Sequence, residues 1–250
     1  ALPISVALII PNINFITNDI FLGGLGERVL GNAGTVGVFY LILMVSGNGL
    51  GNALQVLISR HGGEGNIAAI NKVFAQGIRI ALQFAIAGIL LTWFVAPLCL
   101  KPFIKAENFD MEMEFLRIRV WGLPFLYLFQ CGNAFLICSL NSKYMTIGMI
   151  GEALINIFFD YVLIHGTLSF PQLGFNGAAV ASVIAEISGM SIVYIVIFKK
   201  GLKNKFNLFS DFSYHKTTSR SIVNLAAPLV LHFAISLITW LVFFILLVHS

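Results

Sequence analysis

Residues 175–198 read FNGAAVASVIAEISGMSIVYIVIF and carry a single charged side chain, Glu186. A helix needs about 20 apolar residues to cross the hydrocarbon core of a bilayer, so this stretch is long enough to cross it. Comparable apolar runs lie near residues 3–22, 35–58, 74–98, 118–140, 143–165 and 222–248. The sequence therefore predicts an all-α integral membrane protein, a polytopic helical bundle of about seven transmembrane helices.

The composition of the chain agrees with a lipid environment. Hydrophobic residues make up 58% of the 250 residues and charged residues 10%, whereas soluble domains carry about 25% charged residues. The net charge of +4 does not indicate a nucleic-acid partner, because the basic residues fall in short connectors. Cys99, Cys131 and Cys138 lack zinc or disulfide spacing, so we interpret them as packing residues.

The basic residues are divided unequally between the two predicted ends of the bundle. Of the 15 Lys and Arg residues, ten fall on one side and five on the other. The larger group is Arg60, Lys72, Arg79, Lys143, Lys199, Lys200, Lys203, Lys205, Lys216 and Arg220, and the smaller is Arg28, Lys101, Lys105, Arg117 and Arg119. The positive-inside rule then predicts a multi-pass protein of the cytoplasmic membrane with its N-terminus in the cytoplasm. Residues 166–174 would form an external loop.

Two aspartates lie within predicted membrane helices. Asp19 is late in the first apolar run and Asp160 is late in the fifth. Both runs point from cytoplasm to outside, so we expect the two carboxylates at a similar depth in the outer half of the membrane. A charge at that depth is costly and usually marks a functional site. The alternative, that these groups only hydrogen-bond helices together, stays open.

Further polar residues lie near Asp160 in the helical pattern. Glu152, Asn156 and Asp160 are spaced i, i+4 and i+8, which places them on one face that must point to the bundle interior. Glu186 follows Ser182 by four residues in the sixth run. Glu186 and Glu152 are predicted accessory groups, although Glu152 lies close enough to the cytoplasmic end to serve as an interfacial anchor.

Motifs of enzymes and channels are missing from the sequence. There is no His-Glu-x-x-His, no Gly-x-Ser-x-Gly and no carbonyl-filter sequence, and the five His residues have no ligand spacing. We therefore expect no catalytic residues, no enzymatic activity, no cofactor and no resident metal.

Five short motifs resemble those of the multidrug and toxic compound extrusion (MATE) family. They are NDIFLGGLG at 18–26, ISRHGGEGN at 58–66, FLRIRVWGLPF at 115–125, NIFFD at 156–160 and GAAVAS at 177–182. The family signature around the first motif has Thr where Ile20 stands here. With the flanking runs, the motifs cover residues 2–198 in the order and spacing of that family.

The resemblance implies a transporter of two six-helix lobes. Residues 1–198 would form the N-terminal six-helix lobe, residues 199–220 a cytoplasmic inter-lobe connector, and residues 221–250 the first helix of the C-terminal lobe. The chain would then be truncated, and the missing C-terminal lobe would be its partner. Family members exchange amphiphilic, often cationic, small molecules for H⁺ or Na⁺ by alternating access.

The resemblance also implies which residues bind the coupling cation. By motif, Asp19, Asn156 and Asp160 form the cation-binding site, with Ser182 at a hydroxyl position. Phe15 stands where some members have a tyrosine one turn before the first aspartate, which removes a hydroxyl. The coupling ion would be H⁺ or Na⁺.

Two other functions are alternatives to cation-coupled drug or metabolite export. One is a flippase for a lipid-linked saccharide, which would need a basic cavity for phosphates. The other is a membrane-embedded lipid-modifying enzyme, which would need a reactive cluster.

Overall fold

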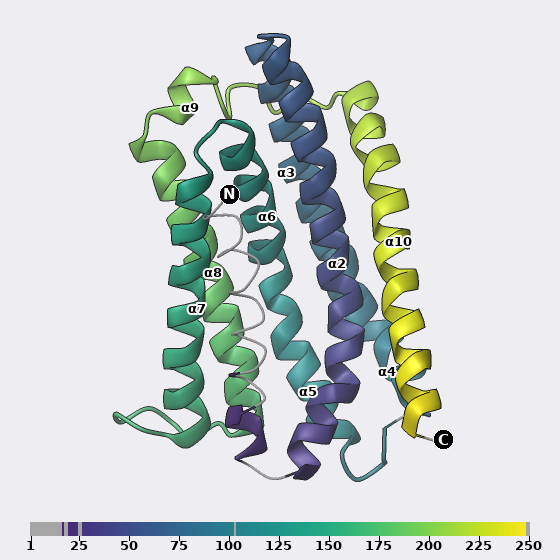
Figure 1. Cartoon of the computed structure of the whole chain (residues 1–250). Coiled ribbons are helices and arrows are strands. Elements are labelled where there is room, and N and C mark those ends of the chain that lie inside the picture. Colours follow the sequence, from purple (N-terminus) through teal and green to yellow (C-terminus); the bar gives the residue numbers. More distant parts are fainter. Residues whose placement is uncertain (1–16, 18–19, 25–26, 103, 249–250) are drawn as a thin grey trace.

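The computed structural model describes the backbone of residues 17, 20–24, 27–102 and 104–248. It describes the side chains of residues 17, 20–24, 36–102, 104–233, 235, 236 and 239. Long helices cross the bundle from end to end and are joined by short turns (Figure 1). The helices in chain order are α2 (Glu27–Gly63), α3 (Ile67–Leu90), the π-helix η1 (Leu91–Val95), α4 (Ala96–Leu100), α5 (Phe109–Arg119), the 3₁₀-helix η2 (Val120–Gly122), α6 (Leu123–Cys138), α7 (Ser142–His165), α8 (Phe175–Lys199), α9 (Leu202–Lys205) and α10 (Lys216–Val248).

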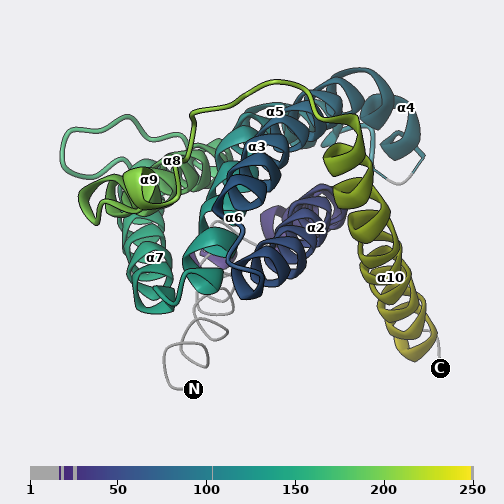
Figure 2. The same cartoon turned by 90° about the horizontal axis from the view of Figure 1, so that it is seen from above.

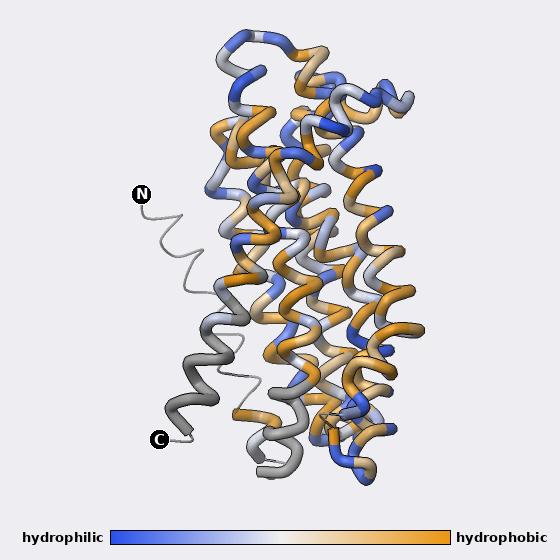
Figure 3. Tube along the Cα trace, turned by 90° about the vertical axis from the view of Figure 1, so that its right-hand side faces the viewer, coloured by the Kyte–Doolittle hydropathy of each residue, from blue (hydrophilic) through white to orange (hydrophobic). Residues whose placement is uncertain are grey.

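Five helical rods among the described residues are long and apolar enough to cross a membrane. They cover Val36–Gly63, Ile67–Leu100, Phe109–Cys138, Ser142–His165 and Phe175–Lys199. Hydrophobic residues dominate the middle of the bundle and hydrophilic residues gather towards its ends (Figure 3). The all-α membrane fold is thus confirmed. Most of the predicted first run, at 3–22, lies outside the described residues, and the run at 222–248 falls within α10.

Local chemistry explains where several helices begin and end. Asn66 caps α3, because its side-chain oxygen accepts a hydrogen bond of 3.0 Å from the backbone N–H of Ala69. The helix therefore begins at Ile67, earlier than the apolar run at 74–98 suggested. A helix end is explained in the same way: α7 ends at His165 because Gly166 adopts a left-handed conformation with φ of +69°.

The fourth apolar run begins earlier in the structure than in the sequence. We predicted it at 118–140, but α5, η2 and α6 form one rod that spans Phe109–Cys138. Pro124 lies in the first turn of α6, directly after η2, where the fixed φ of proline suits the start of an α-helical segment. The consequence is that Arg119 lies inside a rod and not in a connector.

α7 and α8 pack against each other along their whole lengths. Gly148 of α7 faces Val193 of α8 near one end, and Gly177 of α8 lies against the backbone of Leu163 of α7 near the other. A Cβ atom at Gly177 would come within 2.8 Å of the Leu163 carbonyl group. Small residues allow this close approach, which is a common device of membrane helices. We call the α7–α8 contact and the side chains facing it the seam.

The segment between α8 and α10 is held against α3. The Asn71 side chain donates a hydrogen bond of 2.9 Å to Ser210, and the Gln76 side chain donates one of 2.7 Å to the carbonyl of Ser213. Ser219, in the first turns of α10, donates a further bond of 2.9 Å to Gln76. Viewed from above, α10 crosses beside α2 and α3, on the opposite side of the bundle from α7 (Figure 2).

The two groups of basic residues lie largely at opposite ends of the bundle. Arg60 lies in the last turn of α2 and Lys199 ends α8 at one end, while Lys101 follows α4 at the other (Figure 1). Arg119 is the exception, since its side chain is only 15% exposed. The prediction that Arg119 is a connector charge was wrong. Without it, ten basic residues at one end of the bundle compare with four at the other.

Candidate cation site

Asp160 is fully buried in the seam, with 0% of its surface exposed. Neither of its carboxylate oxygens accepts a hydrogen bond in the described part of the structure. Asn156, one turn earlier on α7, is 4% exposed, and its side-chain nitrogen also has no partner. The expected inward direction of this helix face is confirmed for both residues. A buried carboxylate without a partner is unfavourable by itself, so it is suited to bind a cation.

The first apolar run reaches the C-terminal end of α7. The Phe21 ring packs against Tyr161, with ring centroids 6.4 Å apart, and against His165 at 6.1 Å. Asp19 and Phe15 lie outside the described residues. The meeting of Asp19 with Asp160 therefore stays a prediction.

Ser182 lies on α8, which packs against α7, the helix that carries Asp160 and Asn156. It is 8% exposed. The described structure records no hydrogen bond from Ser182 to either α7 residue. Ser182 is thus buried on the expected helix, and its role as a cation ligand stays a prediction.

Glu186, one turn beyond Ser182, is buried in an ion pair. Its Oε1 atom lies 2.7 Å from Nη2 of Arg119 and accepts a hydrogen bond of 3.1 Å from the Tyr40 hydroxyl. The Arg119 guanidinium also lies 4.1 Å from the centre of the Tyr40 ring. Three rods, carrying α2, α5 and α8, therefore meet at one neutralised charge pair.

Gly122 leaves the space that this ion pair fills. A Cβ atom at Gly122 would collide with Oε2 of Glu186 and lie 2.9 Å from Nη1 of Arg119. Both of these atoms are buried and make no hydrogen bond. Neither Tyr40 nor the pairing of Arg119 was predicted, because the helix that carries Arg119 was thought to begin only one residue before it.

Glu152 was predicted as an accessory group of the site, with an interfacial anchor as the alternative. It lies near the middle of α7, and its carboxylate packs against Gly189 of α8. Electrostatic interactions reach it from Glu186 and from Arg119. Close packing of α7 on α8 draws Glu152 into the seam, which distance along the sequence could not show.

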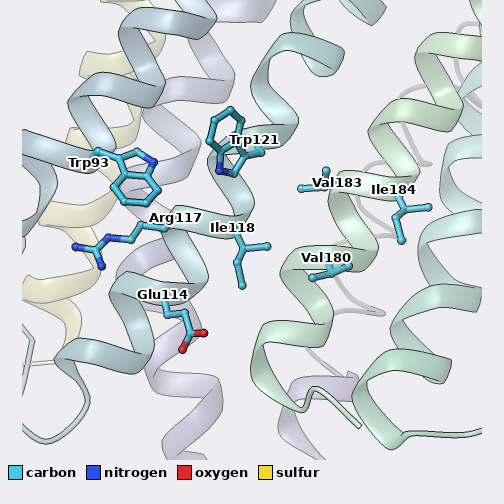
Figure 4. Close-up of a pocket in the computed structure, with 8 residues that line it drawn as sticks. All are labelled: Trp93, Glu114, Arg117, Ile118, Trp121, Val180, Val183 and Ile184. Atoms are coloured by element: carbon cyan, nitrogen blue, oxygen red, sulfur yellow. The ribbon is translucent and has the colours of Figure 1, made fainter. Parts of the chain in front are cut away.

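A separate cavity of about 400 Å³ lies outside the seam and is lined almost entirely by apolar atoms. Trp93 and Trp121 lie on one side of it and Val180, Val183 and Ile184 of α8 on the other (Figure 4). Arg117 points away from α8 and holds its guanidinium 5.1 Å from the Trp93 ring. None of the residues predicted to bind the cation lines this cavity, so it is not the site predicted from sequence.

The polar groups of the seam suit a proton or a hard monovalent cation. Carboxylate and amide oxygens are ligands of hard ions, not of soft transition metals. Within the described ranges, no group of three or more His, Cys, Asp and Glu side chains could hold a metal ion.

Comparison with known proteins decides the family. The MatE family profile matches residues 3–162, which is more than half of the chain. The chain belongs to the MatE family. MatE proteins are transporters and not enzymes, in agreement with the expectation from sequence.

Two curated relatives illustrate the extent of the similarity. A probable multidrug resistance protein NorM of Synechocystis sp. is 24% identical over 217 residues, covering 86% of this MatE chain and 47% of the relative. A protein of the same description from Halalkalibacterium halodurans is 32% identical over 174 residues, covering 67% of this chain and 37% of the relative. This chain spans about half the length of the curated relatives it matches.

Solved structures show the same MatE fold. An outward-facing multidrug resistance MATE family transporter of the MOP superfamily superimposes with a TM-score of 0.82 at 18% identity. A MOP superfamily transporter from Pyrococcus furiosus gives 0.77 at 19% identity. Each match covers 92% of this chain and 50% of the solved chain.

Proposed function

We propose that the intact protein, meaning this chain with a second lobe, is a cation-coupled antiporter that exports amphiphilic, often cationic, small molecules by alternating access. The observation that carries the proposal is Asp160, a fully buried carboxylate without a hydrogen-bond partner, beside Asn156 in a MatE chain. Asp160, Asn156, Ser182 and Asp19 would form the cation site. The coupling ion is H⁺ or Na⁺, and no cofactor is needed.

Cation binding at this site would change the energy of the lobe. A proton on Asp160, or a Na⁺ shared with the Asn156 side-chain oxygen, removes net charge from an apolar interior. A ligand shifts a conformational equilibrium only through its different affinities for the two states. If the outward-facing state binds the cation more tightly, a cation gradient drives the lobe through its cycle and expels the substrate.

The proposed membrane orientation places residues 199–220 in the cytoplasm as the connector between lobes, with residues 1–198 as the first lobe and 221–250 opening the second. Support comes from the ten basic residues that group at this end. In a cysteine-free variant of the intact protein, Lys203→Cys should react with a membrane-impermeant maleimide only after the membrane is opened. Reaction from outside in intact cells would reverse the orientation.

The flippase alternative receives less support. A phosphate-bearing lipid needs basic side chains free to face it. Among the residues whose side chains are described, Arg119 is drawn into the bundle, and Glu186 already neutralises it. This arrangement favours a cation site over an anion site.

The test is transport of ethidium, a fluorescent amphiphilic cation, in proteoliposomes that contain the intact protein. An inward-directed gradient of Na⁺ or of H⁺ is imposed separately, with the membrane potential clamped. One gradient should drive ethidium in the opposite direction, and its identity names the coupling ion. Ethidium movement that ignores both gradients would contradict the antiporter proposal.

A further inference from the structure

The seam contains more negative than positive side chains. Glu152 and Asp160 come from α7 and Glu186 from α8, while Arg119 is the cation within reach of all three. Arg119 forms its ion pair with Glu186, because their nearest charged atoms are 2.7 Å apart. Two carboxylates therefore remain without a fixed counter-charge in the described part of the seam, and Asp160 accounts for only one of them.

Glu152 is the second of these carboxylates. Its Oε2 atom lies 3.1 Å from the position of a Cβ atom on Gly189, so the carboxylate rests on a bare stretch of the α8 backbone. Glu186 precedes Gly189 by three residues and so lies on the same face of α8. The negative charge of Glu186 repels the Glu152 carboxylate, and the positive charge of Arg119 attracts it. The described residues offer Glu152 neither a hydrogen bond nor an ion pair.

Hydrogen-bond donors are scarce around Glu152. Glu186 is only 4% exposed, and its buried Oε2 atom accepts no hydrogen bond among the described residues. The other titratable side chains described on the helices around α7 either donate their hydrogen bond to another group or, in the case of a thiol, are only weak donors. Tyr40 donates to Glu186, Tyr127 donates to the carbonyl of Leu43, Tyr194 donates to the carbonyl of Leu128, and Cys131 is buried. A carboxylate only accepts hydrogen bonds, but a protonated carboxyl group adds a donor.

We propose that Glu152 is a second proton-binding site of this lobe, distinct from the Asn156–Asp160 site, so that the lobe takes up two cations. A proton from water, delivered as H₃O⁺, converts the carboxylate to a neutral carboxyl group and leaves H₂O. This removes the repulsion from Glu186 and leaves the Arg119–Glu186 pair intact. A Na⁺ fits less well, because it needs several oxygen ligands and the nearby amide, Asn156, belongs to the other site.

Infrared difference spectroscopy can detect the proton directly. The intact protein is reconstituted in lipid, and spectra are recorded between alkaline and acidic pH in the region of the protonated carboxyl C=O stretch. Glu152→Gln should remove one band, and Asp160→Asn should leave that band in place. Glu152→Asp should keep a band at a shifted frequency, which excludes misfolding as the cause of loss. Glu114→Gln, at an exposed position on α5, is the matched control and should leave the bands of Glu152 and Asp160 unchanged.

Two results would overturn the inference. One is a Glu152→Gln spectrum identical to that of the wild type, and the other is loss of the same band in Glu152→Gln and Asp160→Asn. The step from proton binding to coupling rests on the proposed function. There, the number of cations exchanged per ethidium, read from the reversal potential, should fall by one in Glu152→Gln. If the wild type shows no coupled transport, the antiporter proposal fails, but the spectra still decide whether Glu152 binds a proton.

Discussion

Asp160 and Glu186 are both buried carboxylates on neighbouring helices, yet their surroundings differ completely. Glu186 is held by Arg119 at 2.7 Å and by the Tyr40 hydroxyl at 3.1 Å. Asp160 is less exposed still and has no partner among the described residues. The pair joins three rods and fixes charge at one place, whereas the unpaired acid keeps its oxygens free for a cation. Burial alone therefore does not identify a binding site, and the presence or absence of a built-in counter-charge does.

The largest effect is expected from removing the unpaired acid. Asp160→Asn keeps the size and the polarity of the side chain. The amide cannot take up a proton as a carboxylate does, and it has no negative charge to neutralise Na⁺. In the intact protein, gradient-driven ethidium efflux should fall to background, while the melting temperature stays the same or rises, because an uncompensated buried group has been removed. Efflux and thermal unfolding of the purified protein provide the two measurements. Wild-type transport with unchanged dependence on pH and Na⁺ would make Asp160 a structural residue only.

Breaking the ion pair should instead destabilise the fold. Arg119→Met leaves Glu186 buried without its counter-charge, for which we expect a loss of about 3–5 kcal/mol in the free energy of unfolding. The double variant Arg119→Met/Glu186→Met removes both charges and should recover most of that loss. Chemical unfolding in detergent measures both. If the double variant is no more stable than the single one, the contact between the two charges is not what stabilises this junction.

Crowding the ion pair should have a smaller effect. Gly122→Ala puts a methyl group where Glu186 Oε2 now lies and should lower the free energy of unfolding by about 1–3 kcal/mol as the pair shifts. Gly37→Ala in α2 is the matched control, since a Cβ atom there meets nothing within 4 Å. The control should be neutral or slightly stabilising, because Ala favours a helix over Gly. Equal effects of the two changes would show that the ion pair can shift to make room for a methyl group at Gly122 without loss of stability.

The sequence predicted the fold well because its signals are local. Long apolar runs and Gly-rich turns define membrane helices without any tertiary information, and the i, i+4 spacing of Asn156 and Asp160 was enough to point both inward. Arg119 was misjudged because its rod begins at Phe109, within a charged stretch that has no apolar signal. Tyr40 was missed because a tyrosine in an apolar run has no signature of its own. Its partner Glu186 is 146 residues away, so their contact depends on tertiary packing.

The smallest effect should come from a charge outside the membrane, in the segment that joins α8 to α10. Asp211 accepts hydrogen bonds from the side chain and the backbone N–H of Ser213, and it lies 3.1 Å from Nε2 of His215. The Ser213 bonds, with a contribution from His215, lower the pKa of Asp211 below its ordinary value. This turn supports the Gln76 contact that holds the segment on α3.

Asp211→Asn should loosen that segment without affecting the helices. Because folding lowers the pKa of Asp211, its contribution is fully present above the unfolded value of about 3.9 and is lost as the pH falls through the lower folded value. Hydrogen exchange, corrected for the intrinsic rate, should therefore be several-fold faster at residues 206–215 in the variant at pH 7, and the difference should shrink below about pH 4. Asp110→Asn, at an exposed position at the opposite end of the bundle, should change nothing there. A difference between variant and wild type that persists unchanged into acid would mean that the side-chain shape of Asp211, and not its charge, orders the connector.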